Sequence, residues 1–360
     1  MVLDIRKIHP AAASEPPEKL VDPQSDLEVL LWQAAEAVEA GVRARSAKLL
    51  RQLAPADKGL ELLWRILESE GDPRRLVAAQ MLGFHRAWLV SSSAVRRLLK
   101  GLRRERDADV AAALVWGLRQ HSEIGEFITH PSQSLAREAA LGLPLNRDTL
   151  GPLAHALLTA CPPQVERVLL DKLGHLHPSL VRALVDQFHQ GHAQVPSERF
   201  SPIFSRLPQV PLFEIFLEER SALAWNPQQG FAQTIAAQSW HRLAHSAELA
   251  LCQRPSLELL RYLFNRCGEN DAFARRHAHF LQATLNRTGP DAGPELLEHL
   301  ERLTASASED KVVRLAQLLV ELSARLDGQA ENKATELLED LKSRSADLKL
   351  KIYHLQQGLA

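Results

Sequence analysis

DPRRLVAAQMLG, residues Asp72–Gly83, and DADVAAALVWG, residues Asp107–Gly117, are two versions of one short, alanine-rich pattern. Each begins with an aspartate that can cap a helix and ends with an apolar residue followed by glycine. The amphipathic segments that precede them, KGLELLWRILESEGD and SSSAVRRLLKGLRRERD, predict a partner helix for each. The repeated pattern therefore predicts stacked helical hairpins, in which each quoted segment is the second helix.

The closing glycine recurs further along the chain. Gly83, Gly117, Gly142 and Gly174 lie 34, 25 and 32 residues apart, which is irregular but typical of helical hairpins that lose or gain a turn. Small residues in these segments allow neighbouring hairpins to approach each other closely. We expect each glycine to end its helix in the left-handed conformation, which costs glycine no Cβ strain.

The second helices resemble those of HEAT repeats, especially the short bacterial kind known as PBS-lyase-like HEAT repeats. In that family the second helix has an Asp-Pro corner, Val-Arg, spaced alanines and a terminal Ala-Leu-Gly. GDPRRLVAAQMLG keeps the Asp-Pro, the Arg and the Leu-Gly, whereas DADVAAALVWG has Trp116 where leucine is usual. The resemblance covers about residues 55–178. It implies an all-α, HEAT-like α-solenoid of antiparallel helical hairpins, degenerate in the C-terminal half.

Composition supports a helical protein that stays in a reducing compartment. Hydrophobic residues make up 45% and aromatic residues only 5% of the 360 residues, and period-two runs typical of strands are nearly absent. The cysteines Cys161, Cys252 and Cys267 are far apart and form no CxxC pair. No apolar run approaches the roughly 18 residues of a membrane span, and the N-terminus lacks a signal-peptide core. We expect a cytoplasmic protein without a membrane partner.

Prolines and changes in periodicity divide the chain into five predicted regions. A capping box formed by Ser25 and Glu28 is expected to begin the first helix. The regions are a flexible proline-rich arm (1–24), a HEAT-like repeat array (25–190), a proline-rich irregular connector (191–230), degenerate helical repeats (231–328) and a C-terminal helix of coiled-coil type (329–360).

The predicted C-terminal helix has apolar residues at alternating steps of four and three, which is the spacing of a coiled-coil seam. The same residues fit a terminal helix that packs on the preceding hairpin, and that interpretation is the better supported of the two. A free seam would make the protein a homo-oligomer. The candidate self-association residues are Leu338, Leu341, Leu348, Ile352 and Leu355.

Charge is unevenly distributed although the formal net charge is only −1. Residues 40–110 contain 15 Lys and Arg against 8 Asp and Glu, whereas residues 291–341 contain 12 Asp and Glu against 5 Lys and Arg. The basic side chains include a helix face opposite an apolar stripe, which fits a phosphate site, an acidic protein surface, or simply a solvated face. The candidate binding residues are Arg74, Arg75, Arg96, Arg97, Lys100, Arg103 and Arg104.

The segment HRLAH offers the strongest metal-site candidate. His241 and His245 share one helix face at the spacing that zinc-binding helices use. Arg242 replaces the glutamate of the HExxH motif, so the pair is a weak candidate and we expect neither a metal nor a cofactor. The sequence contains no nucleotide-binding loop, hydrolase elbow or marked nucleophile with its base. We therefore expect no enzyme activity.

These observations favour a non-catalytic scaffold or adaptor within a larger bacterial assembly, because solenoids present extended surfaces to other proteins. The expected partner has an acidic or helical surface. The alternative is a nucleic-acid-binding protein that uses the basic helix face. A third hypothesis follows from the resemblance, since some HEAT-like proteins are DNA glycosylases, but Trp64 and Trp116 fit apolar packing positions better.

Overall fold

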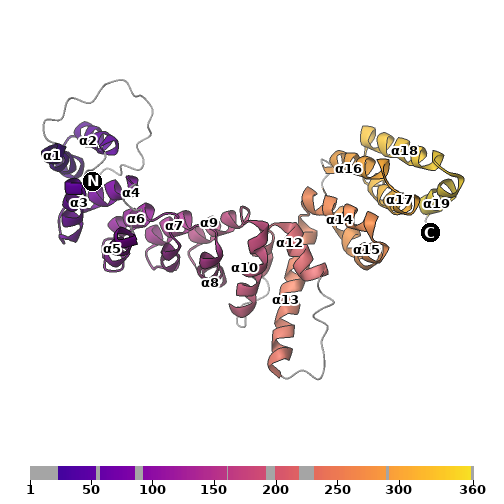
Figure 1. Ribbon diagram of the computed structural model, residues 1–360, viewed down its shortest axis with the longest axis horizontal. Helices are drawn as coiled ribbons and strands as arrows, with labels where there is room; N and C mark the ends of the chain where they lie inside the picture. Colours follow the sequence, from indigo (N-terminus) through magenta and orange to yellow (C-terminus); the bar gives the residue numbers. More distant parts are fainter. Residues whose placement is uncertain are drawn as a thin grey trace. The chain divides into compact units, whose positions relative to one another are not determined.

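The computed structural model describes residues 23–53, 57–85, 92–159, 161–191, 199–218, 231–288 and 292–357. All regular structure in these residues is helical, and the chain divides into two compact units, Met1–Lys172 and Leu173–Ala360. Within each unit, successive helices pack as antiparallel hairpins (Figure 1). The predicted fold class, an all-α solenoid of helical hairpins, is confirmed.

The first unit alternates first and second helices along the chain. The second helices α4, α6 and α7 pack on one another in order (Figure 1). The elements of this unit are α1 (Pro23–Glu36), α2 (Ala40–Gln52), α3 (Asp57–Glu68), α4 (Arg75–Phe84), α5 (Ser92–Leu102), α6 (Ala108–Gly117), the 3₁₀ helix η3 (Ser122–Phe127), α7 (Gln133–Gly142), the 3₁₀ helix η4 (Arg147–Thr149), α8 (Leu150–Leu158) and α9 (Pro163–Leu173).

Glycine is required where α4 and α6 cross. A Cβ added at Gly83 would lie 2.6 Å from Cε3 of Trp116, and a Cβ added at Gly117 would lie 2.8 Å from Cα of Gly83. Both helices are buried along nearly their whole length, since each has a neighbouring helix on two sides. The small residues of the repeated pattern therefore set the distance between adjacent hairpins, as the sequence indicated.

The prediction that these glycines end their helices in the left-handed conformation is wrong. Among the described residues only Gly71, Gly328 and Gln120 have a positive φ. Gly83 lies within α4, Gly117 and Gly142 are the last residues of α6 and α7, and Gly174 directly follows α9, and none of the four has a positive φ. A glycine at the end of a helical pattern can serve either as a left-handed cap or as a point where another helix approaches closely. At Gly83 and Gly117 the structure shows the close approach.

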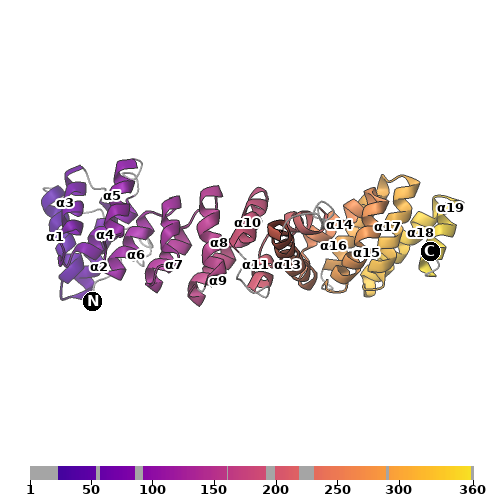
Figure 2. The ribbon, with the colours of Figure 1, turned by 90° about the horizontal axis from the view of Figure 1, so that it is seen from below.

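The second unit contains a cluster of aromatic residues and then three hairpins. Phe204 packs on Phe188 and Phe216, while α11 contacts α13 and α12 contacts α14. Figure 2 shows α16, α17 and α18 side by side. The elements are α10 (Pro178–Gly191), α11 (Phe200–Phe204), α12 (Gln209–Phe213), the π-helix η6 (Glu214–Glu218), α13 (Phe231–Gln253), α14 (Leu257–Glu269), α15 (Asp271–Leu285), α16 (Gly293–Ala305), α17 (Glu309–Ser323), α18 (Gly328–Ser343) and α19 (Ala346–Gln356).

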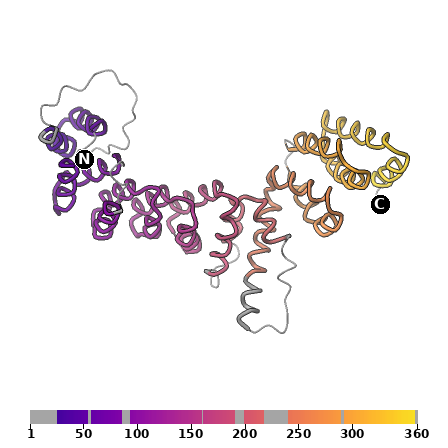
Figure 3. The backbone as a smooth tube through the Cα atoms, in the orientation of Figure 1, coloured from indigo at the N-terminus to yellow at the C-terminus, as the bar shows by residue number. Residues whose placement is uncertain are grey.

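The prediction of a single C-terminal helix is wrong. Two helices, α18 and α19, replace it, and the chain turns back between them (Figure 3). The Ser345 hydroxyl accepts a hydrogen bond from Leu348 N at 3.1 Å, so it caps the start of α19. The predicted seam residues Leu338, Leu341, Leu348 and Ile352 are at most 3% exposed, and Leu355 is half-buried. They form the packing of this hairpin on α17.

The first helix also begins differently from the prediction. Because α1 starts at Pro23, Ser25 lies within its first turn and not at the N-cap. The predicted arm lies outside the described residues except for its last two positions. The described part of the predicted connector, residues 199–218, is made of the short helices α11, α12 and η6. In the part of the chain that the structure describes, no helix is long and apolar enough to cross a membrane.

Candidate functional site

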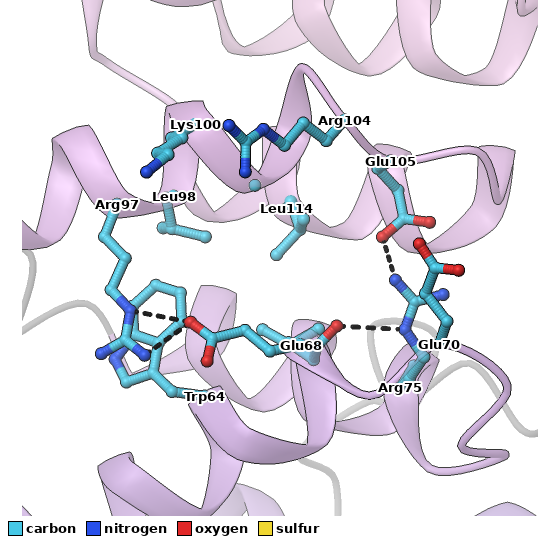
Figure 4. Close-up of a pocket in the computed structure, with 12 residues that line it drawn as sticks. Trp64, Glu68, Glu70, Arg75, Arg97, Leu98, Lys100, Arg104, Glu105 and Leu114 are labelled. Atoms are coloured by element: carbon cyan, nitrogen blue, oxygen red, sulfur yellow. Dashed lines mark hydrogen bonds and ion pairs between the residues drawn. The ribbon is translucent and has the colours of Figure 1, made fainter.

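A hollow of about 460 Å³ opens between α3 and α5, the first helices of two successive hairpins (Figure 4). Leu98 and Leu114, both buried, supply its apolar floor. Trp64 forms part of one wall, and Lys100 and Arg104 lie on the opposite side. The glycine contact that brings α4 and α6 together has no counterpart here, because long side chains line the facing surfaces of α3 and α5.

An arginine, a tryptophan and a glutamate form one end of the hollow. The guanidinium carbon of Arg97 lies 4.5 Å from the centroid of the Trp64 ring, and Arg97 Nη2 donates to Glu68 Oε1 at 2.6 Å. The Arg97 and Glu68 side chains are 47% and 62% exposed, so this pair contributes at most about 1 kcal/mol to stability. Trp64 is half-buried and not in the core, contrary to the sequence interpretation.

The other end is closed by a less exposed ion pair. Arg75 donates to Glu105, and its Nε also donates to the Leu67 carbonyl at 3.2 Å. The Glu105 side chain is only 6% exposed and accepts hydrogen bonds from the backbone N–H groups of Arg106 and Asp107. Arg75 therefore ties the end of α3 to the turn between α5 and α6, which is a structural role.

Two further candidate arginines are held by carboxylates outside the hollow. Arg74 Nη2 lies 2.7 Å from Asp72 Oδ2, and its Nη1 lies 3.1 Å from Glu28 Oε1. The hydrogen bond from Arg74 lowers the pKa of Asp72, and the same bond raises the pKa of Arg74. In the turn after α5, Arg103 pairs with Glu126 at 2.8 Å.

The structure thus separates the seven predicted binding residues into two groups. Arg75, Arg97, Lys100 and Arg104 line the hollow, whereas Arg74, Arg96 and Arg103 do not. Lys100 and Arg104 are exposed and form no ion pair within the described residues. These two cations, which lie next to an apolar floor, are what an acidic ligand would meet.

Sequence reasoning missed the carboxylates that neutralise the basic face. Glu68 pairs with Arg97 across 29 positions and Glu105 pairs with Arg75 across 30. These separations are close to one repeat length. The sequence therefore did contain a sign of these ion pairs, namely opposite charges about one hairpin apart. The spacing of the glycines alone does not determine which side chains face each other.

Other candidate reactive groups are not brought together. His241 and His245 are exposed on α13, and no group of three possible metal ligands occurs among the described residues. Burial raises the pKa of the Cys252 thiol to about 11 and that of Cys267 to about 12. Both thiols therefore stay protonated near neutral pH, which makes them poor nucleophiles.

No family model matches this chain, and no curated protein matches it. Among solved structures, it is similar to a mutant of Kap121p at 13% identity and a TM-score of 0.40, covering 99% of this chain and 42% of that one. An engineered protein matches at 15% identity and a TM-score of 0.33, covering 93% of this chain and 98% of that one. The condensin Cnd3–Cnd2 subcomplex of S. pombe matches at 14% identity and a TM-score of 0.30, covering 94% and 55%. The chain thus spans less than half the length of Kap121p.

Proposed function

We propose that this protein is a non-catalytic interaction scaffold that binds an acidic segment of a partner protein in the hollow between α3 and α5. The observation that carries the proposal is the pair Lys100 and Arg104, two exposed cations that form no ion pair within the described residues and lie beside a buried leucine floor. The other two arginines of the hollow are already engaged, Arg97 by Trp64 and Glu68 and Arg75 by Glu105.

The charged, apolar and aromatic residues of the hollow contribute to binding in different ways. Lys100 and Arg104 attract a carboxylate and orient the partner, because exposed charges act mainly on the rate and specificity of association. An apolar side chain of the partner can then cover Leu98 and Leu114, which removes apolar surface from water. Trp64 offers a large and already oriented wall, so little conformational entropy is lost when it is covered.

A protein ligand fits this surface better than a nucleic acid does. Binding to a phosphate backbone draws its free energy from many cations that release counterions. Four of the candidate arginines, Arg74, Arg75, Arg97 and Arg103, already pair with carboxylates of the same chain. Nucleic-acid binding remains the alternative outcome of the experiment.

The test is affinity purification of the tagged full chain from its native host, with and without nuclease and at two salt concentrations. The variant Lys100→Glu/Arg104→Glu is compared with Arg137→Glu/Arg167→Glu, which makes the same change of charge at exposed positions of α7 and α9. We expect a discrete, nuclease-resistant set of proteins that the first variant loses and the second retains. Recovery of nucleic acid that disappears at high salt would establish the alternative instead.

A further inference from the structure

Among the described residues, most of the large hydrophobic side chains that are exposed lie on α1, just after it, or on α19. Five of the seven large exposed hydrophobic residues in the described part of the chain belong to α1, to the turn after it, or to α19. All seven are Val29, Trp32, Val38, Leu141, Leu249, Leu350 and Tyr353. Isolated exposed apolar residues are ordinary, but their concentration on two helices points to contact surfaces.

The exposed face of α1 is apolar and acidic. Val29 and Trp32 are 50% and 41% exposed, and with Glu36 they follow helical spacing along one face. The guanidinium carbon of Arg74 lies 4.3 Å from the centroid of the Trp32 ring, so the indole is held in one orientation. The helix contains no lysine or arginine, and the exposed Glu36 has no ion-pair partner within the described residues.

The exposed face of α19 is apolar and basic. Leu350 and Tyr353 are 57% and 53% exposed, and they line a hollow of about 470 Å³ between α18 and α19. Lys349 lies beside them, exposed and without an ion pair in the described part of the chain. The other lysine of the hollow, Lys342, is already held by Glu339 at 2.6 Å.

We propose that α1 of one copy docks on the α18–α19 hollow of a second copy of this chain. Each face carries two large exposed apolar side chains at helical spacing, and the charges beside them are opposite, Glu36 on one face and Lys349 on the other. In this arrangement Trp32 enters the hollow and covers Leu350 and Tyr353. The surface is distinct from the seam predicted from the sequence, whose residues are buried in the same hairpin.

This contact joins two different surfaces, so it is heterologous. Such an interface leaves one α1 face and one hollow free after every step and builds rings or open chains, whereas a symmetric dimer would use one surface twice. The buried aromatic and aliphatic side chains supply most of the affinity, while the charge pair mainly sets the register and the association rate.

The experiment is sedimentation velocity of the full chain over a range of concentrations. Trp32→Ala removes the α1 anchor and leaves the hollow intact, whereas Leu350→Ala/Tyr353→Ala does the reverse. We expect the unchanged chain to form species larger than a dimer, and each variant alone to associate at least about tenfold more weakly. A mixture of the two variants forms a discrete one-to-one dimer, because it contains one intact contact.

A matched control and a charge exchange complete the test. Leu141→Ala/Leu249→Ala removes exposed apolar residues from α7 and α13 and retains assembly. Glu36→Lys and Lys349→Glu each weaken association, and the chain that carries both regains it because opposite charges meet again. The proposal is overturned by a chain that stays monomeric, by a variant that still self-associates fully, or by a mixture that forms no dimer; unchanged circular dichroism excludes misfolding.

Discussion

At the residue scale, Gly83 and Gly117 act through the side chain they lack and not through their backbone conformation. The sequence indicated that small residues matter here, because a glycine closes each alanine-rich helix. It could not distinguish a left-handed cap from a close contact, because both favour glycine. Only the position of the neighbouring helix decides, and here that neighbour brings Trp116 against Gly83.

Replacing Gly83 or Gly117 with alanine should destabilise the protein by about 1–3 kcal/mol, because the added methyl group overlaps a neighbouring helix. Gly101 provides the control. It lies inside α5, and a Cβ added there would meet no neighbouring atom within 4 Å, so Gly101→Ala should stabilise the helix by up to about 1 kcal/mol. Urea unfolding followed by circular dichroism measures both, and equal effects at the three positions would contradict the role of the glycine contact.

His299 gives a pH-dependent contribution to the stability of the second unit. Burial, together with Arg302 and Arg261, lowers the pKa of His299, and its Nε2 lies 3.0 Å from Asn265 Oδ1. The unfolded chain therefore binds a proton more readily than the folded chain does. Stability should decrease as the pH falls below the unfolded value of about 6.5.

The variant His299→Asn removes this titration. Thermal unfolding of both chains between pH 8 and pH 5 should show a smaller loss of stability for the variant than for the unchanged chain. Parallel curves would refute the assignment to His299, since every other side chain is the same in both proteins.

At the scale of elements, ion pairs between successive hairpins decide which charges remain available. The basic stripe that runs along α5 and into the turn after it could be predicted from helical periodicity, and Lys100 and Arg104 do line the hollow. The partial neutralisation of the basic residues could not be predicted. Glu68 lies on α3 and pairs with Arg97 of α5, while Glu105 lies in the turn after α5 and pairs with Arg75 of α4, so both pairs depend on how successive hairpins pack. The spacing of apolar residues also did not reveal the break between α18 and α19. The steps of four and three continue across the break, so the pattern looks the same for one long helix and for two packed helices.

The two ion pairs of the hollow should differ in energy because they differ in burial. Glu105→Gln leaves Arg75, which is 17% exposed, without its counter-charge, and should destabilise the protein by about 3 kcal/mol. Glu68→Gln breaks a pair that is about half exposed and should cost less than about 1 kcal/mol. Chemical denaturation of the two variants side by side measures the difference, and similar losses would show that burial does not control these pairs.

At the scale of the whole molecule, the sequence established the fold class but only part of the organisation. The resemblance to HEAT repeats is confined to about residues 55–178, where alanine-rich second helices repeat. The second unit relies on an aromatic cluster around Phe204 and Phe213 and on leucine-rich hairpins, which have no comparable repeat. The predicted boundaries of the five regions stay predictions. The partner could not be predicted either, because surface side chains select it and these follow no repeated sequence pattern.

Photo-crosslinking from the hollow tests the central claim most directly. Gly101 lines the hollow, and a Cβ added there would meet no neighbouring atom within 4 Å, so a benzophenone amino acid placed there in the native host reports what occupies the hollow. The account predicts a discrete crosslinked protein that is absent when the same group replaces Arg137 on α7 and when Lys100 and Arg104 are reversed to glutamate. Crosslinks that are the same from both positions, or that join nucleic acid, would contradict it.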